Sequence, residues 1–403
     1  MNAIAEQYVK LVLALGQHDA SYVDAYYGPP EWKPADGSKQ ALSEIDAAAS
    51  ALIGQLAAVK PAAENELETL RHRYLTRQLE SMRARIAILS GRRLTFDEES
   101  RALYDAVAPV HSESAFQATL DELNTLLPGQ GSLIERYDAF RDAFQIPSNR
   151  LSRVFDLAIA ECRRRTFEHS TLPSGESFTV EYVRNKSWSG YNWYQGQYRS
   201  LIQVNVDLPI YIDRAIDLAC HEGYPGHHVY NALLEKNLMR DRGWMEVSVY
   251  ALFSPQSLIA EGTANYGIEV TFNEDERLAF ERDALFPAAG LDSTRVEDCY
   301  RVQTSVDKLS YAGNEAARRY LNAEIDRPAA VAWLTKFAMM SPERAEQRTR
   351  FFDEYRSYVI NYNLGKDLVK AFIEKRAGID RSRRWREFVE LLCSPRLPSS
   401  LKE

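Results

Sequence analysis

The stretch HEGYPGHH, residues 221–228, lies where a helical pattern is interrupted, and it holds three of the seven histidines of the chain. The residues just before it repeat apolar side chains at helical spacing, so His221 and Glu222 are expected on the last regular turns of a helix. Pro225 and Gly226 follow, and a proline inside a helix removes a hydrogen bond and clashes with the preceding turn. The sequence therefore predicts a helix that is broken or bulged within this stretch.

The break decides which histidines can share a metal ion. Side chains four residues apart on a regular helix are neighbours, whereas side chains six residues apart lie about 9 Å apart along the axis and on different faces. If Pro225 and Gly226 loop out of the helix, His227 returns to the side of His221, as the second histidine does in the H-E-x-x-H signature of zinc peptidases. His228 is the alternative ligand, but it needs a larger distortion.

A third metal ligand is expected downstream, because hydrolytic zinc sites usually take three protein ligands and keep one position for water. Glu261 follows Leu258-Ile-Ala260 and precedes Gly262-Thr-Ala264, and an unpaired carboxylate among small and apolar residues is costly to bury. A metal ion removes that cost. The alternative is a glutamate that faces solvent at the start of a helix.

Glu222, next to His221, then has the position of a general base that takes a proton from the attacking water. Zinc would lower the pKa of that water and polarise the scissile carbonyl. Asn265 and Asp217 are candidates to accept the second N–H of His221, since ligating histidines usually donate it to an oxygen. Iron, cobalt or manganese could replace zinc at a site of two histidines and one glutamate.

The rest of the chain predicts a mainly α fold with a small antiparallel β patch next to the metal helix. Residues 1–170 form an N-terminal helical region, and residues 171–403 form a catalytic region that begins with the β patch at 171–209. Together they are expected to make one compact unit. An edge strand at 201–207 could pair with the extended backbone of a substrate.

Composition excludes several classes of function. The formal charge of −8 and the isoelectric point near 5.6 disfavour nucleic acids and anionic membranes as partners, since both require a concentrated basic surface. No stretch approaches the roughly 18 apolar residues of a membrane-spanning helix. The four cysteines form no C-x-x-C pair, so a thiolate zinc cluster is not indicated and a cytoplasmic location fits best. Oligomeric state is not predicted.

HEGYPGHH, followed by EGTANYGIE at 261–269, resembles the bacterial domain-of-unknown-function family 885, whose signature is H-E-x-x-P-G-H-H with a downstream E-G-x-A-x-Y. Its members are regarded as largely uncharacterised zinc metallopeptidases with a helical, gluzincin-like fold. The resemblance implies that His221, His227 or His228, and Glu261 bind the metal and that Glu222 is catalytic.

The C-terminal third departs from this family. Residues 362–365 keep a Y-x-x-G element, but residues 356–359 replace the P-G-Q-A segment of many members, and residues 307–311 end in tyrosine where the family has D-x-x-x-H. Substrate recognition is therefore the part that the resemblance specifies least. Tyr311, Tyr362 and Arg319 are candidate donors to the oxyanion that develops in the transition state, with a packing or surface role as the alternative for each.

These observations predict a zinc-dependent metallopeptidase that hydrolyses short peptides. Two alternatives stay open: a metal-dependent amidase for a non-peptide metabolite, and a non-catalytic helical protein in which the histidine cluster holds a structural metal or none. The sequence does not specify the cleavage mode.

Overall fold

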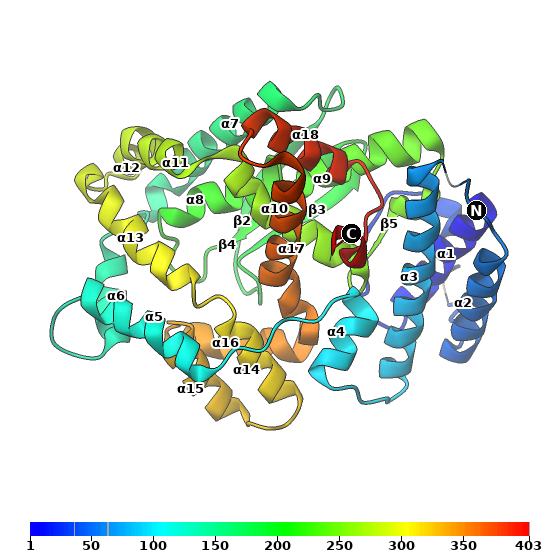
Figure 1. Ribbon diagram of the computed structural model, residues 1–403, viewed down its shortest axis with the longest axis horizontal. Coiled ribbons are helices and arrows are strands. Elements are labelled where there is room, and N and C mark those ends of the chain that lie inside the picture. The colour runs from blue at the N-terminus through cyan, green and yellow to red at the C-terminus, as the bar shows by residue number, and fades with distance from the viewer. Residues whose placement is uncertain (36, 63, 403) are drawn as a thin grey trace.

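The computed structural model describes residues 1–35, 37–62 and 64–402, and it is mainly α-helical, as predicted (Figure 1). Helical spacing of apolar residues accounts for most elements, since most helices bury one stripe of side chains, while α10 is buried on nearly all sides. The α-helices are α1 (Asn2–Gly16), α2 (Leu42–Ala57), α3 (Glu66–Leu89), α4 (Phe96–Tyr104), α5 (Glu113–Leu126), α6 (Leu133–Asp142), α7 (Leu151–His169), α8 (Asp213–Leu218), α9 (His227–Leu234), α10 (Pro255–Thr271), α11 (Glu274–Phe280), α12 (Phe286–Ala289), α13 (Val296–Asp307), α14 (Ala312–Leu321), α15 (Arg327–Phe337), α16 (Pro342–Tyr355), α17 (Ile360–Ala377) and α18 (Arg381–Leu392).

The predicted β patch contains β2 (Ser177–Val183), β3 (Gly190–Gly196) and β4 (Arg199–Asn205), in the order β2-β4-β3. The prediction of an antiparallel sheet is only half right. β3 and β4 form an antiparallel hairpin, whose turn residues Gln197 and Tyr198 both have positive φ, as a tight right-twisted hairpin requires. β2 pairs with the other edge of β4 and runs parallel to it.

The expected edge strand at 201–207 is therefore wrong, because β4 is the central strand and both of its edges are paired. β3 lies at an edge of this sheet instead. A further strand in the predicted N-terminal helical region was not expected: β1 (Val23–Tyr26) pairs antiparallel with β5 (Val249–Ala251). This pairing brings the N-terminal part of the chain close to the segment that precedes α10.

Two stretches with continuous helical patterns are broken in the structure. The pattern at 305–325 is interrupted by a turn at Lys308–Tyr311, between α13 and α14. The pattern at 351–377 is interrupted at Arg356, whose φ of 53° ends α16 before a short 3₁₀ turn leads into α17. These breaks turn α14 and α17 away from the helices before them, and apolar periodicity cannot reveal such a change of direction.

The buried apolar side chains within the described residues form two large clusters. One contains Tyr8 and Leu364, and the other contains Ala158 and Tyr266, so both combine residues from before and after position 170. α10 and α17 pack side by side through the middle of the molecule, between α1–α3 at one end and α11–α13 at the other (Figure 1). Among the described residues, no helix is long and apolar enough to cross a membrane.

Candidate metal centre

The helix that carries His221 ends in a π-helical turn, η3 (Ala219–Gly223), and α9 begins anew at His227. The peptide bond before Pro225 is cis, and the Gly226 amide donates to the carbonyl of Cys220 at 2.9 Å. Only glycine fits at 226, because a Cβ there would lie 1.9 Å from the carbonyl oxygen of His221. The prediction that this stretch bulges the helix is confirmed: the backbone hydrogen bonds widen from Tyr224 to Ala219 and from Gly226 to Cys220 before α9 begins.

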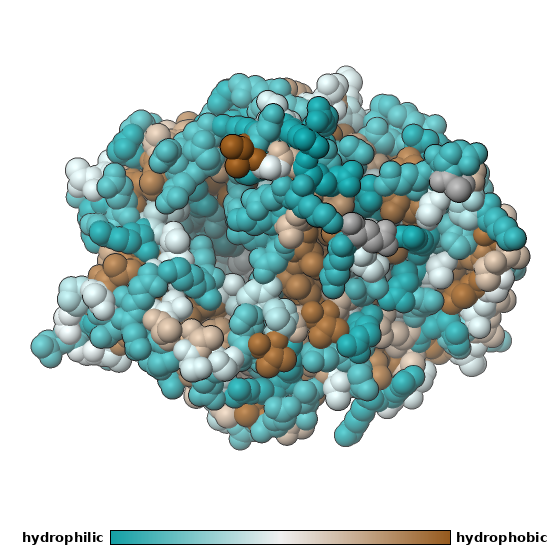
Figure 2. Space-filling model, in the orientation of Figure 1, coloured by the Kyte–Doolittle hydropathy of each residue, from teal (hydrophilic) through white to brown (hydrophobic). Residues whose placement is uncertain are grey.

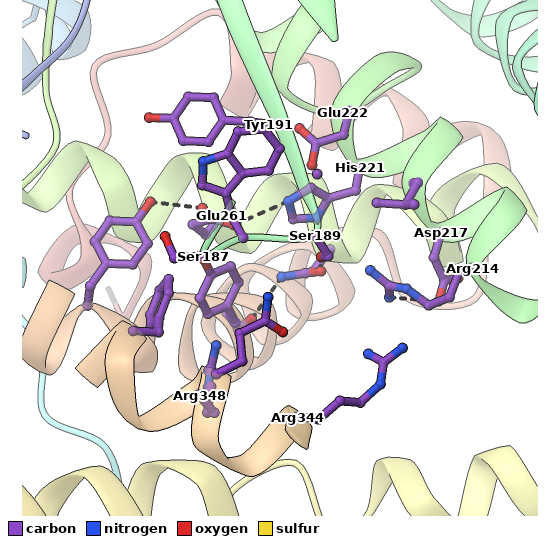
Figure 3. A pocket seen from close by; sticks show the side chains of 18 of the residues that line it. Ser187, Ser189, Tyr191, Arg214, Asp217, His221, Glu222, Glu261, Arg344 and Arg348 are labelled. Carbon is purple, nitrogen blue, oxygen red and sulfur yellow. Dashed lines mark hydrogen bonds and ion pairs between the residues drawn. The ribbon is translucent and has the colours of Figure 1, made fainter. Parts of the chain in front are cut away.

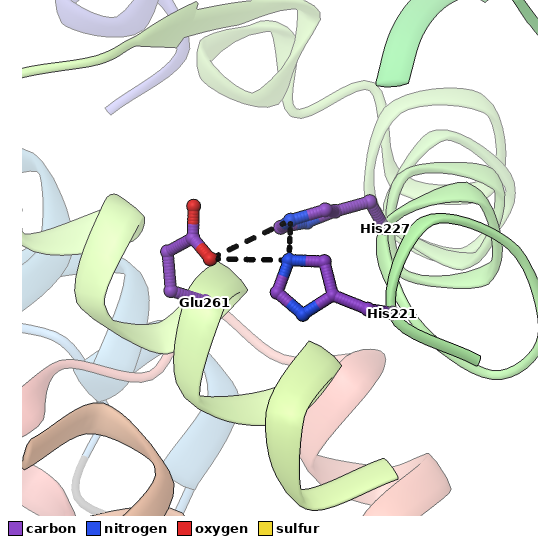
Figure 4. Close-up of side chains that lie close together, drawn as sticks. All are labelled: His221, His227 and Glu261. Carbon is purple, nitrogen blue, oxygen red and sulfur yellow. Dashed lines mark hydrogen bonds and ion pairs between the residues drawn. The ribbon is translucent and has the colours of Figure 1, made fainter. Parts of the chain in front are cut away.

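The bulge brings His227 to His221, as predicted, and α10 brings Glu261 to both (Figure 4). The Nε2 atoms of the two histidines are 3.1 Å apart. Glu261 Oε2 lies 3.3 Å from Nε2 of His221 and 3.8 Å from Nε2 of His227. Three ligand-type atoms from two separate segments thus face one point.

This arrangement fits a zinc ion. Ligand atoms about 2.0–2.2 Å from a tetrahedral zinc lie roughly 3.3 Å from one another, close to the three separations found here. Glu261 Oε2 is buried and, within the described part of the chain, accepts no hydrogen bond. A buried carboxylate oxygen without a partner is unfavourable, and a cation between it and the two imidazoles would satisfy it.

The imidazole of His221 is oriented by Asn265, one of the two residues predicted for this role. Asn265 donates from Nδ2 to the carbonyl of Tyr362 at 3.2 Å, which turns its Oδ1 toward Nδ1 of His221 at 3.0 Å. Nδ1 therefore carries the proton and Nε2 presents its lone pair to the metal position. Asp217, the other candidate, forms ion pairs with Arg277 and Arg214 instead.

The protonation of the site shows how strongly it attracts positive charge. Burial opposes a charge on His227, but the nearby carboxylate of Glu261, followed by those of Glu222 and Asp24, raises the pKa of His227 to about 9. Burial likewise opposes the charge on Glu261, yet the two histidines hold the pKa of its carboxyl well below the usual range.

His228, the alternative ligand, faces away from this group. It is fully buried, with Nδ1 2.9 Å from the hydroxyl of Ser200 and Nε2 2.9 Å from Oε2 of Glu176. Tyr224 also donates to Glu176, at 2.6 Å. His228 thus ties α9 to β4 and to the segment before β2, and it is not a ligand in this geometry, because successive residues on a helix point in different directions.

Glu222 is buried and lines the same pocket as the metal group, on the side of His221 (Figure 3). Its Oε1 lies where a Cβ on Gly190 would be only 2.8 Å away, so the glycine at the start of β3 makes room for the carboxylate. Asn192 on the same strand donates to the Glu222 carbonyl at 2.7 Å. β3 therefore fixes both the backbone and the side chain of the predicted base.

The pocket has a volume of about 570 Å³, and the hollow left of centre in Figure 2 lies over it. Tyr362 lines this pocket, and its pKa is raised by burial and by the charge of Glu261, so its hydroxyl stays protonated. Tyr311 does not line the pocket: its hydroxyl donates to Asp367 at 2.5 Å. Arg319 also lies elsewhere, paired with Glu113. The prediction of Tyr311 as a catalytic residue is therefore corrected, because the turn before α14 directs it away from the site.

Several pocket residues were not predicted. Tyr358 donates to Oε1 of Glu261 at 2.8 Å and so fixes the carboxylate. Asp24, on β1, accepts from Tyr191, and burial, opposed by that hydrogen bond, raises the pKa of Asp24 to about 6. Neither Asp24 nor Tyr358 belongs to a motif that marks it as a site residue. The nearest signal is the Y-x-x-G element, because Tyr358 lies one helical turn before its tyrosine, Tyr362.

Comparisons with known proteins provide evidence on the fold alone. No family model and no curated protein sequence matches the chain. A candidate lipoprotein from Colwellia psychrerythraea is similar in structure, with a TM-score of 0.53 and 15% identity over 92% of this chain and 69% of that chain. This level of similarity indicates a shared fold.

Two further structures are less similar. A candidate lipoprotein of unknown function from Shewanella oneidensis gives a TM-score of 0.47 at 12% identity, covering 89% of this chain and 71% of that chain. An M32 carboxypeptidase from Deinococcus radiodurans R1 gives a TM-score of 0.37 at 13% identity, covering 97% and 88%. Scores this low carry no argument about fold or function. The chemistry of this chain therefore has to be inferred from its own site.

Proposed function

We propose that this protein is a zinc-dependent metallopeptidase that hydrolyses short peptides. One observation carries the proposal: His221, His227 and the otherwise unpartnered Oε2 of Glu261 converge at zinc-like separations in the wall of a pocket that Glu222 also lines. A structural zinc site would be closed by four protein ligands, whereas three ligands beside a cavity leave a position open.

Zinc at this site would polarise the scissile carbonyl and acidify the attacking water. Glu222 is placed to take the proton of that water and to pass it to the leaving amine. Asn265 holds His221 in the ligating tautomer, and Tyr358 holds Glu261. The protonated hydroxyl of Tyr362 supports its predicted role as a hydrogen-bond donor to the developing oxyanion.

The pocket also supports a small substrate. Its volume of about 570 Å³ is within the range of small-molecule sites, and its wall includes several aromatic rings suited to apolar side chains. Membership in domain-of-unknown-function family 885 is part of this proposal, since the structure gives a role to each half of the HEGYPGHH motif. A short peptide as partner and a cytoplasmic location stay predictions.

Metal analysis and peptide profiling test the proposal together. The purified wild-type protein is expected to hold one zinc per chain and to cleave members of a short-peptide library, with product ends identified by mass spectrometry. Glu222→Gln should keep the zinc and lose at least about a thousandfold in kcat, in line with removal of a general base. His221→Ala should lose the zinc as well.

These measurements also distinguish the peptidase from an amidase and from a non-catalytic metal protein. Full peptide cleavage by Glu222→Gln with zinc bound would refute the role of Glu222. A protein that binds zinc but cleaves only non-peptide amides would be an amidase, and one that binds zinc and cleaves neither would be a non-catalytic metal protein.

A further inference from the structure

One face of α16 points into the pocket that holds the metal group. Its lining residues are Arg344, Gln347, Arg348, Phe351 and Tyr355, spaced at helical intervals. Figure 3 shows Arg344 and Arg348 rising from this helix into the pocket. Two arginines therefore line one wall of a partly buried cavity, although the protein as a whole is acidic.

Arg348 differs from the paired arginines of the interior. Its side chain is partly buried, its Nε is fully buried and has no hydrogen-bond partner among the described residues, and its guanidinium lies 4.6 Å from the ring centre of Phe351 and 5.7 Å from those of Phe352 and Tyr362. By contrast, Arg71 is paired with Glu246 at 2.5 Å and Arg85 with Asp19 at 2.6 Å.

An unpaired guanidinium is unfavourable to bury. Arginine stays charged in proteins, so it cannot escape this cost by losing its proton. Burial lowers the pKa of Arg348, as expected for a charge that lacks a partner. The missing partner is therefore expected to be an anion that arrives with the substrate.

The position of Arg348 limits where that anion lies. Its neighbour Tyr362 is also a neighbour of the metal group, and Arg348 is close enough to Glu261 for that carboxylate to act on its charge. Arg344, one helical turn earlier, is less free, because it donates to the carbonyl of Pro209 at 3.0 Å. Of the two arginines, Arg348 is therefore the one that has no hydrogen-bond partner in the described part of the chain and that shares the neighbour Tyr362 with the metal group.

We infer that Arg348 binds a carboxylate of the substrate and so orients the scissile bond at the metal group. A guanidinium recognises a carboxylate through two parallel hydrogen bonds, and the aromatic rings around Arg348 hold its plane in place. This inference rests on the proposed peptidase function for what happens at the bond. The carboxylate is either the C-terminus of a short peptide or an acidic side chain.

Binding measurements test the inference without relying on turnover. The protein is the zinc-loaded full chain with Glu222→Gln, so that bound peptides persist, and affinity is measured by calorimetry. The first pair of probes is N-acetyl-Phe-Phe as the free acid and as its C-terminal amide. The second pair is N-acetyl-Phe-Glu amide and N-acetyl-Phe-Gln amide. Arg348→Met and Arg348→Lys are compared with Arg350→Met, which removes an exposed arginine from the same helix outside the pocket lining.

The free acid should bind at least about tenfold more tightly than its amide, and Arg348→Met should abolish that preference while Arg348→Lys keeps part of it and Arg350→Met keeps all of it. A preference for the Glu peptide over the Gln peptide that needs Arg348 would also support the inference, with a side chain as the source of the anion. No binding, no preference for a carboxylate, or a preference that survives Arg348→Met would overturn it.

Thermal unfolding excludes a merely structural role. Arg348→Met should not lower Tm, because it removes an unpaired charge, whereas Arg71→Met should lower it by breaking a buried pair. An equal loss in both variants would overturn the inference. If the wild-type protein cleaves peptides but shows no preference for a carboxylate, the peptidase function is supported and the role of Arg348 is refuted. If binding depends on Arg348 but no peptide is cleaved, the role of Arg348 is supported and the peptidase function is refuted.

Discussion

At the scale of residues, the adjacent histidines 227 and 228 have opposite surroundings. His227 faces His221 and Glu261 at the pocket, whereas His228 is enclosed by Ser200 and Glu176. A motif with two consecutive histidines therefore combines one candidate metal ligand with one residue that fixes the local structure. Substituting each in turn should separate the two roles.

His227→Ala should abolish zinc binding and leave the fold intact, because the side chain contributes mainly to the metal group. His228→Ala should keep the metal group but lower the free energy of unfolding by about 3 kcal/mol, since it removes one of the three hydrogen-bond donors to the buried carboxylate of Glu176 and the contact with Ser200. Zinc content and urea unfolding are the measurements. Zinc loss in the second variant with an unchanged unfolding midpoint would reverse the assignment.

Glu176 gives this contact a pH dependence. Burial opposes its charge, but hydrogen bonds from His228, Tyr224 and Arg163 lower its pKa to about 2. Its side chain is only 2% exposed. A carboxyl whose pKa is lowered by folding stabilises the protein fully above its unfolded pKa, near 4.5, and loses this contribution as the pH falls toward 2.

Glu176→Gln should therefore destabilise the protein by about 3 kcal/mol at pH 6, and the difference from wild type should shrink between pH 4.5 and pH 2. Unfolding by urea across this pH range measures it, with the exposed Glu113→Gln as control. A difference that stays constant with pH would contradict the assignment of the stabilising contact to the ionised carboxylate.

At the scale of elements, the site depends on two close backbone contacts. Gly226 allows the bulge between η3 and α9. Gly262 and Gly365 allow α10 and α17 to cross closely, because a Cβ on Gly262 would lie 2.4 Å from the carbonyl oxygen of Gly365. The first contact pairs the two histidines, and the second brings Tyr358 and Tyr362 to Glu261.

Gly226→Ala should destroy the metal group, because its Cβ cannot be accommodated 1.9 Å from the carbonyl of His221 without opening the bulged turn. A loss of zinc and a decrease in Tm of more than about 10 °C are expected, since several kcal/mol of overlap must be relieved. Gly54→Ala is the matched control: nothing lies within 4 Å of its Cβ position in α2, and it should stabilise the protein slightly. Equal effects of the two substitutions would contradict this account.

At the scale of the whole molecule, the pocket gathers residues from distant parts of the chain. Asp24 comes from β1, the histidines from the central motif, and Arg348 and Tyr358 from the C-terminal part. Both hydrophobic clusters also join early and late segments. Unfolding is therefore expected to be cooperative and to be coupled to the metal group.

Metal removal should lower the stability of the whole protein. At a free zinc concentration one hundred times Kd, binding contributes about 2.7 kcal/mol, which a chelator would remove. Scanning calorimetry with and without EDTA measures the shift in Tm, and readdition of zinc should restore it. His221→Ala should show no such shift; a shift of the same size in that variant would place the metal elsewhere.

The sequence by itself determined the helical class and the distortion at Pro225 and Gly226, and it predicted a metal group of His221, Glu261 and either His227 or His228. These follow from local rules: apolar spacing, proline and glycine geometry, and the requirement that a buried carboxylate have a partner. The choice of His227 and the approach of Glu261 also required α10 to pack against η3.

Only the tertiary structure decided the order of the strands, the separation of Tyr311 from the pocket, and the roles of Asp24, Tyr358 and Arg348. These depend on which distant segments pack together, through the β1–β5 pairing and the crossing of α10 and α17. A tyrosine or an arginine has the same local pattern whether it faces solvent, a core or a pocket, so its function becomes visible only when its neighbours are known.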